Sequence, residues 1–146
     1  DDLMEPELKR EIIMENYLHP YNKEEVSDDR YIKVNSNNES CIDNIDLFIL
    51  FEDNRIKDIK FNGEACAIST SATSIMIKLL IDKTIAEVLD IATNYDNMIN
   101  EKEYDKEVLQ EALCYDDIYK QANRKTCATL PWKGIIKAIE QYKETK

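Results

Sequence analysis

A β-rich stretch in the first half of the chain decides the fold class: Ile45-Asp46-Leu47-Phe48-Ile49-Leu50-Phe51-Glu52-Asp53-Asn54-Arg55-Ile56-Lys57-Asp58-Ile59-Lys60-Phe61. Two runs of aliphatic, β-branched and aromatic residues flank a polar segment that holds an Asp-Asn pair, which is typical of tight turns. The second run alternates apolar and polar residues, as does a strand with one face in water. We therefore expect residues 45–51 and 55–61 to form an antiparallel hairpin.

Upstream of the hairpin, residues 5–18 show helical spacing, with Pro6 near the start. The apolar face of this helix is expected to be formed by Leu8, Ile12, Ile13 and Tyr17. Residues 31–34 are a candidate for a short strand, and the Asn- and Ser-rich residues 35–40 are expected to form a loop.

Downstream of the hairpin, the pattern predicts helices over residues 67–80 and 84–99 and a third helical piece over about 106–119. The last helix is expected to begin near Thr129, because proline is tolerated in a first turn and Pro131 would then lie there. The order of elements indicates an α+β fold, with helices packed on a small three-stranded antiparallel sheet. With 146 residues, of which 43% are hydrophobic, we expect one domain over residues 1–146.

Charge and hydropathy exclude several classes of partner. The net charge of −11 does not suit a phosphate backbone, so we expect no nucleic-acid partner. The longest clean apolar run, at residues 47–51, is too short for a membrane helix, and the first residues do not resemble a signal peptide. We therefore expect a cytoplasmic protein without a membrane partner. In that reducing compartment, the four cysteines are expected to be metal ligands or reactive thiols rather than disulfides.

Three short segments contain the candidate functional groups, which are three thiols and one carboxylate. The segments are Cys41-Ile42-Asp43, Gly63-Glu64-Ala65-Cys66-Ala67-Ile68-Ser69 and Arg124-Lys125-Thr126-Cys127-Ala128-Thr129-Leu130. Three thiolates and one oxygen suit one four-coordinate metal, and the same thiols could handle sulfur. We expect Cys66 at the start of a helix and Cys127 just before one, where the helix dipole favours a thiolate. Cys114 lies outside these segments and is expected to be a buried apolar residue.

The residues around the thiols resemble the NifU/IscU-like iron–sulfur cluster assembly family, and within it the SufU type. The motif Gly-x-x-Cys-Ala-Ile-Ser of that family stands here at residues 63–69, and Arg-x-x-Cys-Ala-Thr-Leu-x-Trp-Lys stands at residues 124–133. The motif Cys-Gly-Asp is kept as Cys41 and Asp43, with Ile42 in place of glycine. Thr126 stands where IscU-type members have histidine, and the stretch between Cys66 and Cys127 is longer than in IscU, which favours the SufU type.

The resemblance implies a SufU/IscU-like fold and a zinc site made by Cys41, Asp43, Cys66 and Cys127. It also implies that Cys41 accepts sulfur from a SufS-like cysteine desulfurase and that Arg124 lies near the metal. The protein would then be a sulfurtransferase-like partner of that enzyme, passing sulfur to a downstream iron–sulfur scaffold or apo-protein. We hypothesise that the partner displaces Cys41 from zinc, so that the freed thiolate can attack the persulfide of the desulfurase.

Two alternatives remain at the level of the sequence. The same four groups could hold a transient iron–sulfur cluster, because thiolates bind such clusters and one oxygen ligand would leave the cluster labile. In that case the protein would be a scaffold. The chain could also be a zinc-stabilised interaction domain without sulfur chemistry, in which Cys41 is inert.

Overall fold

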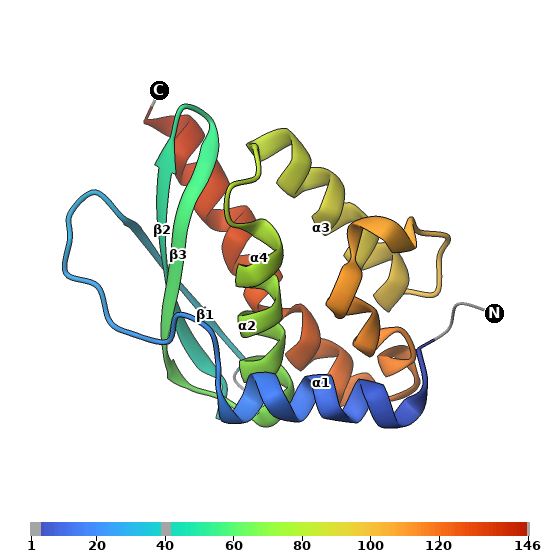
Figure 1. The fold of residues 1–146 in the computed structure, drawn as a ribbon. Coiled ribbons are helices and arrows are strands. Elements are labelled where there is room, and N and C mark those ends of the chain that lie inside the picture. Colours follow the sequence, from blue (N-terminus) through green and yellow to red (C-terminus); the bar gives the residue numbers. More distant parts are fainter. Residues whose placement is uncertain (1–3, 39–41, 146) are drawn as a thin grey trace.

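The computed structural model describes residues 4–38 and 42–145, and it shows helices packed on a three-stranded antiparallel sheet of order β1-β2-β3 (Figure 1). The predicted α+β class is therefore confirmed. The elements are α1 (Pro6–Leu18), β1 (Ile32–Asn37), β2 (Asn44–Glu52), β3 (Arg55–Glu64), α2 (Ala67–Leu80), α3 (Ile85–Ile99), the short 3-10 helices η1 (Lys106–Val108), η2 (Gln110–Tyr115) and η3 (Ile118–Lys120), and α4 (Ala122–Glu144).

The predicted hairpin is present as β2 and β3, and its turn has the backbone that the sequence suggests. Asp53 and Asn54 have φ values of 53° and 61°, the left-handed conformation that a tight two-residue hairpin turn requires. The loop expected over residues 35–40 is wrong in its first half, because β1 continues to Asn37. Residues 35–37 keep strand alternation: Ser36 is buried, while Asn35 lies on the exposed face and donates to Asp46 across the strand pair.

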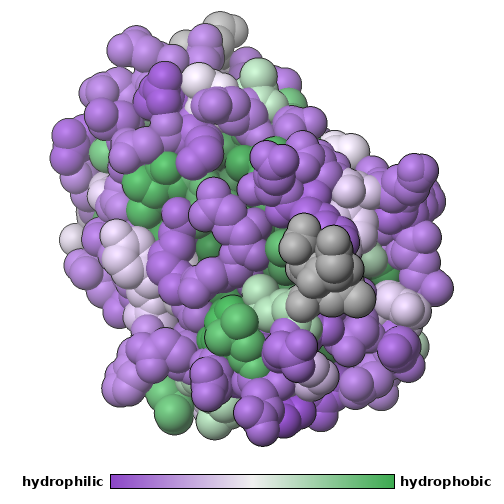
Figure 2. Space-filling model, turned by 45° about the vertical axis from the view of Figure 1, so that its right-hand side comes forward, coloured by the Kyte–Doolittle hydropathy of each residue, from purple (hydrophilic) through white to green (hydrophobic). Residues whose placement is uncertain are grey.

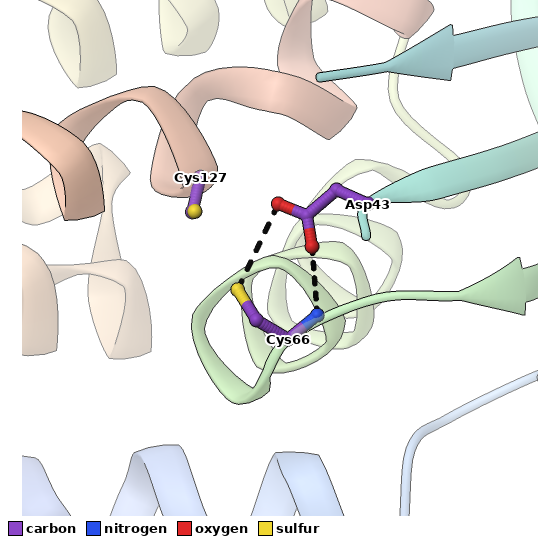
Figure 3. A group of neighbouring side chains, drawn as sticks. All are labelled: Asp43, Cys66 and Cys127. Carbon is purple, nitrogen blue, oxygen red and sulfur yellow. Dashed lines mark hydrogen bonds between the residues drawn. The ribbon is translucent and has the colours of Figure 1, made fainter. Parts of the chain in front are cut away.

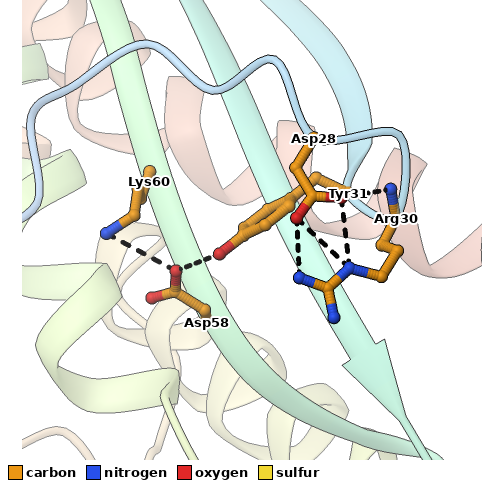
Figure 4. Close-up of polar contacts among 5 residues, drawn as sticks. All are labelled: Asp28, Arg30, Tyr31, Asp58 and Lys60. Atoms are coloured by element: carbon orange, nitrogen blue, oxygen red, sulfur yellow. Dashed lines mark hydrogen bonds and ion pairs between the residues drawn. The ribbon is translucent and has the colours of Figure 1, made fainter.

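The free edge of β3 is covered by the connection between α1 and β1. Phe61 of β3 donates its N–H to the carbonyl of Asn22 and accepts from the N–H of Glu24. Further along, the Tyr31 hydroxyl donates to Asp58 at 2.6 Å, and Lys60 forms an ion pair with the same carboxylate (Figure 4). The hydrogen bond to Asp58 and burial raise the pKa of Tyr31 to about 12, so the hydroxyl stays a donor at neutral pH. These contacts protect the edge strand from pairing with other chains.

The first helix begins one residue later than predicted, at Pro6, and part of its predicted apolar face is wrong. Leu8 and Tyr17 are 45% and 40% exposed, whereas Asn16 is buried. The Asn16 side chain donates to the carbonyl of Ile12 and accepts from Ser74 of α2, so a polar contact replaces the expected apolar one. A hydrogen-bonded amide can be buried at a helix contact with little loss of stability, which the apolar pattern does not reveal.

Helices α2 and α3 lie where the spacing predicts them. Thr84 and Glu87 form a capping box at the start of α3. The third helical piece, expected over residues 106–119, is instead divided into three 3-10 helices. The division has a backbone cause, because Gln110 has a φ of 46° and no α-helix can pass through that conformation.

The last helix, α4, begins at Ala122, so the expected start near Thr129 is wrong. Pro131 lies in the interior of this helix, where proline removes one backbone hydrogen bond and costs about 3 kcal/mol or more. The carbonyl that loses its partner is that of Cys127, four residues earlier. The helix continues because this carbonyl accepts a hydrogen bond from Ser69 of α2 at 3.1 Å. A long-range contact thus compensates a local defect.

The core lies between the sheet and the helices and includes the predicted residues Trp132, Ile135 and Ile139 as well as Cys114, while Ile136 is half-buried. The Trp132 ring stacks on Tyr95 with 4.4 Å between ring centroids. Outside the core, the face in Figure 2 is covered mainly by hydrophilic side chains, with hydrophobic residues visible in separate areas between them. Within residues 4–38 and 42–145, no helix has the length and apolarity needed to cross a membrane.

Candidate metal centre

The strand register brings Asp43 next to Cys66. Asn44 at the start of β2 pairs with Glu64 at the end of β3, so the residues just beyond the pair leave the sheet side by side. Asp43 is 1% exposed, and its Oδ1 accepts the backbone N–H of Cys66 at 2.7 Å. The end of the hairpin therefore fixes a buried carboxylate at the beginning of α2.

Cys66 is the N-cap of α2, as the sequence predicts. Its sulfur accepts a weak hydrogen bond from the N–H of Ser69 at 3.4 Å, which is the role that serine or aspartate usually plays at this position. The Cys66 sulfur also lies 3.7 Å from Oδ2 of Asp43. The Cys66 sulfur therefore lies at the positive end of the α2 dipole.

Cys127 reaches the site from α4, where it lies inside the helix and not before it as expected. Hydroxyl groups from three other elements hold the turn around Cys127. They are Ser69 of α2, which donates to the carbonyl of Cys127, Tyr95 of α3, which donates to Ala128 at 2.7 Å, and Ser36 of β1, which donates to Leu130 at 2.8 Å. The backbone that carries Cys127 is therefore fixed from three directions.

Together, Asp43, Cys66 and Cys127 form one donor group, with all three ligand atoms within 4.8 Å of one another (Figure 3). Burial raises the pKa of the Cys127 thiol well above its ordinary value, and the neighbouring Cys66 and Asp43 raise it further. Burial also acts to raise the pKa of Asp43, but hydrogen bonds from Ser69 and Cys66 outweigh it and the pKa lies below the ordinary value. Without a cation, the group thus holds one carboxylate and a protonated Cys127 thiol.

The two other predicted site residues are Cys41 and Arg124. Cys41 lies outside the described residues, so its predicted roles stay predictions. Arg124 is on α4, three residues before Cys127, and its exposed side chain has no hydrogen bond or ion pair to the rest of the described chain. Ser69, in contrast, contacts Asp43, Cys66 and the Cys127 backbone, and the sequence indicated it only as part of a motif.

Two sulfurs and one carboxylate oxygen are ligands that suit zinc or iron. The donors come from three separate parts of the chain, so a bound ion would join the sheet, α2 and α4. Cys114 is buried in the core and outside the donor group, and burial raises the pKa of its thiol well above the ordinary range. Its predicted role as a small apolar residue is confirmed.

Known proteins with similar sequences show the family of this chain. Residues 8–146 match the family model described as the NifU-like N terminal domain. The zinc-dependent sulfurtransferase SufU of Bacillus subtilis is 34% identical over 133 residues, which cover 90% of this chain and 89% of that protein. The iron–sulfur cluster assembly scaffold protein IscU of Thermotoga maritima is 29% identical over 114 residues, or 78% of this chain and 80% of that protein.

A solved structure shows the same fold. The putative iron–sulfur cluster assembly scaffold protein for the SUF system of Fervidobacterium islandicum superposes with a TM-score of 0.83 at 34% sequence identity, covering 88% of this chain and 93% of that one. The motifs around the donors, the fold that brings them together and these similarities have one explanation. The chain belongs to the NifU-like N-terminal domain family, with SufU-type and IscU-type proteins among its relatives.

Proposed function

We propose that this protein takes part in iron–sulfur cluster assembly by accepting sulfur from a cysteine desulfurase at a metal-bound thiolate site. The observation that carries the proposal is the convergence of Asp43, Cys66 and Cys127 from three segments of the chain. The similarity to a zinc-dependent sulfurtransferase gives the direction of the chemistry. The recipient would be a downstream scaffold or an apo-protein, and the cytoplasmic location stays a prediction.

The donor set fits zinc. Asp43, Cys66 and Cys127 would supply one oxygen and two sulfur ligands, and we propose Cys41 as the fourth ligand. When bound, zinc keeps its thiols deprotonated at neutral pH. The raised pKa of the metal-free Cys127 thiol is consistent with a thiol that becomes a thiolate when a cation binds.

In the sulfur-transfer step, we propose the Cys41 thiolate as the nucleophile. It attacks the outer sulfur of the desulfurase persulfide and forms a new S–S bond. The S–S bond of the donor breaks, and the desulfurase cysteine leaves as a thiolate, so no external oxidant or reductant is needed. The Arg124 guanidinium is proposed to favour anionic sulfur at this end of the site.

An assay with the cognate desulfurase tests the proposal directly. Alanine formation from cysteine should be faster in the presence of this protein than without it, because an acceptor removes the persulfide that blocks further turnover. Metal analysis of the purified protein should show about one zinc per chain. Unchanged alanine formation at saturating concentrations of this protein would contradict the sulfur-acceptor role.

A scaffold role is the second candidate, because the same donors and the IscU similarity support it. Iron and sulfide added under anaerobic conditions would then produce a coloured cluster with visible absorption, and this cluster would pass to an apo-protein. The third alternative, a zinc-stabilised interaction domain, predicts zinc without desulfurase stimulation and without reaction at Cys41. The desulfurase assay and the spectrum together separate the three.

The surface near the donor group suits a protein partner. Tyr17, Leu18 and Ile42 line a hollow of about 470 Å³ together with residues 63–65, which lead into Cys66. Ile42 is 67% exposed and Leu18 59% exposed, although both are large and apolar. Direct persulfide transfer requires the two sulfurs to touch, so the surface beside the site must be covered in the complex. We propose that the desulfurase covers this hollow.

Replacing Leu18 with serine should weaken desulfurase binding about tenfold, because burial of a leucine side chain contributes about 1.5 kcal/mol or more and a factor of ten is about 1.4 kcal/mol. The measurement is calorimetric titration of the desulfurase with each variant. Leu8→Ser is the matched control, since Leu8 is also exposed on α1 but does not line the hollow. Equal desulfurase affinities of the Leu18→Ser and Leu8→Ser proteins would contradict the proposed contact surface. They would not contradict the sulfur-acceptor role, which the alanine-formation assay tests separately.

A further inference from the structure

Ser69 contacts more of the donor group than any described ligand does. It is the third residue of α2 and is completely buried. Its Oγ lies 2.6 Å from Oδ2 of Asp43 and 3.1 Å from the carbonyl oxygen of Cys127, and its own N–H points to the Cys66 sulfur at 3.4 Å. One serine thus touches all three segments that carry donors.

The Ser69 hydroxyl has one proton, and its shorter contact is with the Asp43 carboxylate at 2.6 Å, whereas the Cys127 carbonyl lies at 3.1 Å. The Asp43 carboxylate is shielded from water, so its charge must be balanced by hydrogen bonds inside the protein. The carbonyl of Cys127 has lost its helical partner because residue 131 is a proline. Oδ1 of Asp43 is held by the Cys66 N–H, whereas Oδ2 has the Ser69 hydroxyl at 2.6 Å as its short contact and the weaker donor Cys66 Sγ at 3.7 Å.

We propose that Ser69 is a positioning residue of the metal centre, which holds the Asp43 carboxylate beside Cys66 and Cys127 before a metal arrives. This inference rests on the proposed metal site. An ionised carboxylate can accept about four hydrogen bonds, so each Asp43 oxygen keeps capacity for a cation after these contacts. The hydrogen bond from the Ser69 hydroxyl fixes the direction in which the remaining lone pairs of Asp43 point. Partners of this kind typically contribute a factor of 10 to 100 to metal affinity.

The first experiment compares zinc affinity in two serine variants by competition with a chromophoric chelator. Ser69→Ala should bind zinc about 10 to 100 times more weakly than the wild type. Ser71→Ala is the matched control: Ser71 is also completely buried on α2, but its hydroxyl contacts Tyr115 at 2.5 Å, away from the donors. It should keep wild-type affinity even if the folded protein is less stable.

A spectroscopic readout separates positioning from a general loss of stability. Cobalt(II) reports its ligands through its visible absorption, so cobalt-loaded Ser69→Ala should show shifted ligand-field bands, whereas cobalt-loaded Ser71→Ala should match the wild type. In a double-mutant cycle, Ser69→Ala should have a much smaller effect on zinc affinity when Asp43 is already alanine, because its partner is gone.

The outcomes are distinct. A wild-type protein that binds neither zinc nor cobalt would overturn the proposed metal site and the role of Ser69 with it. If the wild type bound zinc, and Ser69→Ala bound it with the same affinity and gave the same cobalt spectrum, only the role of Ser69 would be overturned. An equally large Ser69→Ala effect with and without Asp43 would also overturn it, since the residue would then not act through that carboxylate.

Discussion

Replacement of Cys41 by alanine should reduce sulfur acceptance to the level seen without this protein. The proposed transfer needs a thiolate that attacks the outer persulfide sulfur, and alanine has no group that can do so. Zinc should still bind, because Asp43, Cys66 and Cys127 remain, although with lower affinity. The measurement is mass spectrometry of this protein after incubation with the desulfurase and cysteine, in which the wild type gains one sulfur per chain.

Cys114→Ala is the control for this prediction. It also removes one thiol, but Cys114 is buried in the core and burial raises the pKa of its thiol. That thiol is neither accessible nor ionised at neutral pH, so this variant should accept sulfur like the wild type. If the Cys41→Ala protein still gained sulfur and still stimulated the desulfurase, another cysteine would have to be the acceptor. Mapping of the persulfide by proteolysis would then identify it.

The donor group could be predicted from sequence because local motifs mark each donor. Cys66 follows a glycine at a strand end and begins a helix, and this local pattern gives its position directly. The proximity of Asp43 to Cys66 follows from the hairpin, since antiparallel pairing brings the residues before β2 and after β3 together. For these donors, local structure and strand pairing are sufficient.

The position of Cys127 could not be predicted in the same way. Its helix begins before it and passes through Pro131, against the local preference for ending a helix at proline. The hydrogen bond that replaces the one lost at Pro131 comes from Ser69, which is distant in sequence. No residue near the proline indicates this hydrogen bond. The burial of Asn16 is a similar case, because its partner Ser74 lies on another helix. Tertiary hydrogen bonds override local patterns at both places.

A second large effect is expected at Gly63, which lies in β3 three residues before the donor Cys66. Gly63 has a φ of 126°, a conformation that residues with a side chain rarely adopt. An added Cβ would overlap the backbone carbonyl oxygen of Asn44, which is the residue after the ligand Asp43. Neither atom belongs to a flexible side chain, so the two strands would have to separate where they deliver Asp43 and Cys66.

Gly63→Ala should therefore lower the free energy of unfolding by about 2–5 kcal/mol, the sum of backbone strain and steric overlap. It should also weaken zinc binding, since the overlap lies between the two ligand segments. Gly134→Ala is the matched control, as these are the two glycines of the chain. There the added Cβ meets the end of the Leu47 side chain at 2.5 Å and no backbone atom, and alanine favours the helix by about 1 kcal/mol. Urea unfolding of both variants measures the difference, and similar stabilities would show that the β2–β3 contact at Gly63 can relax.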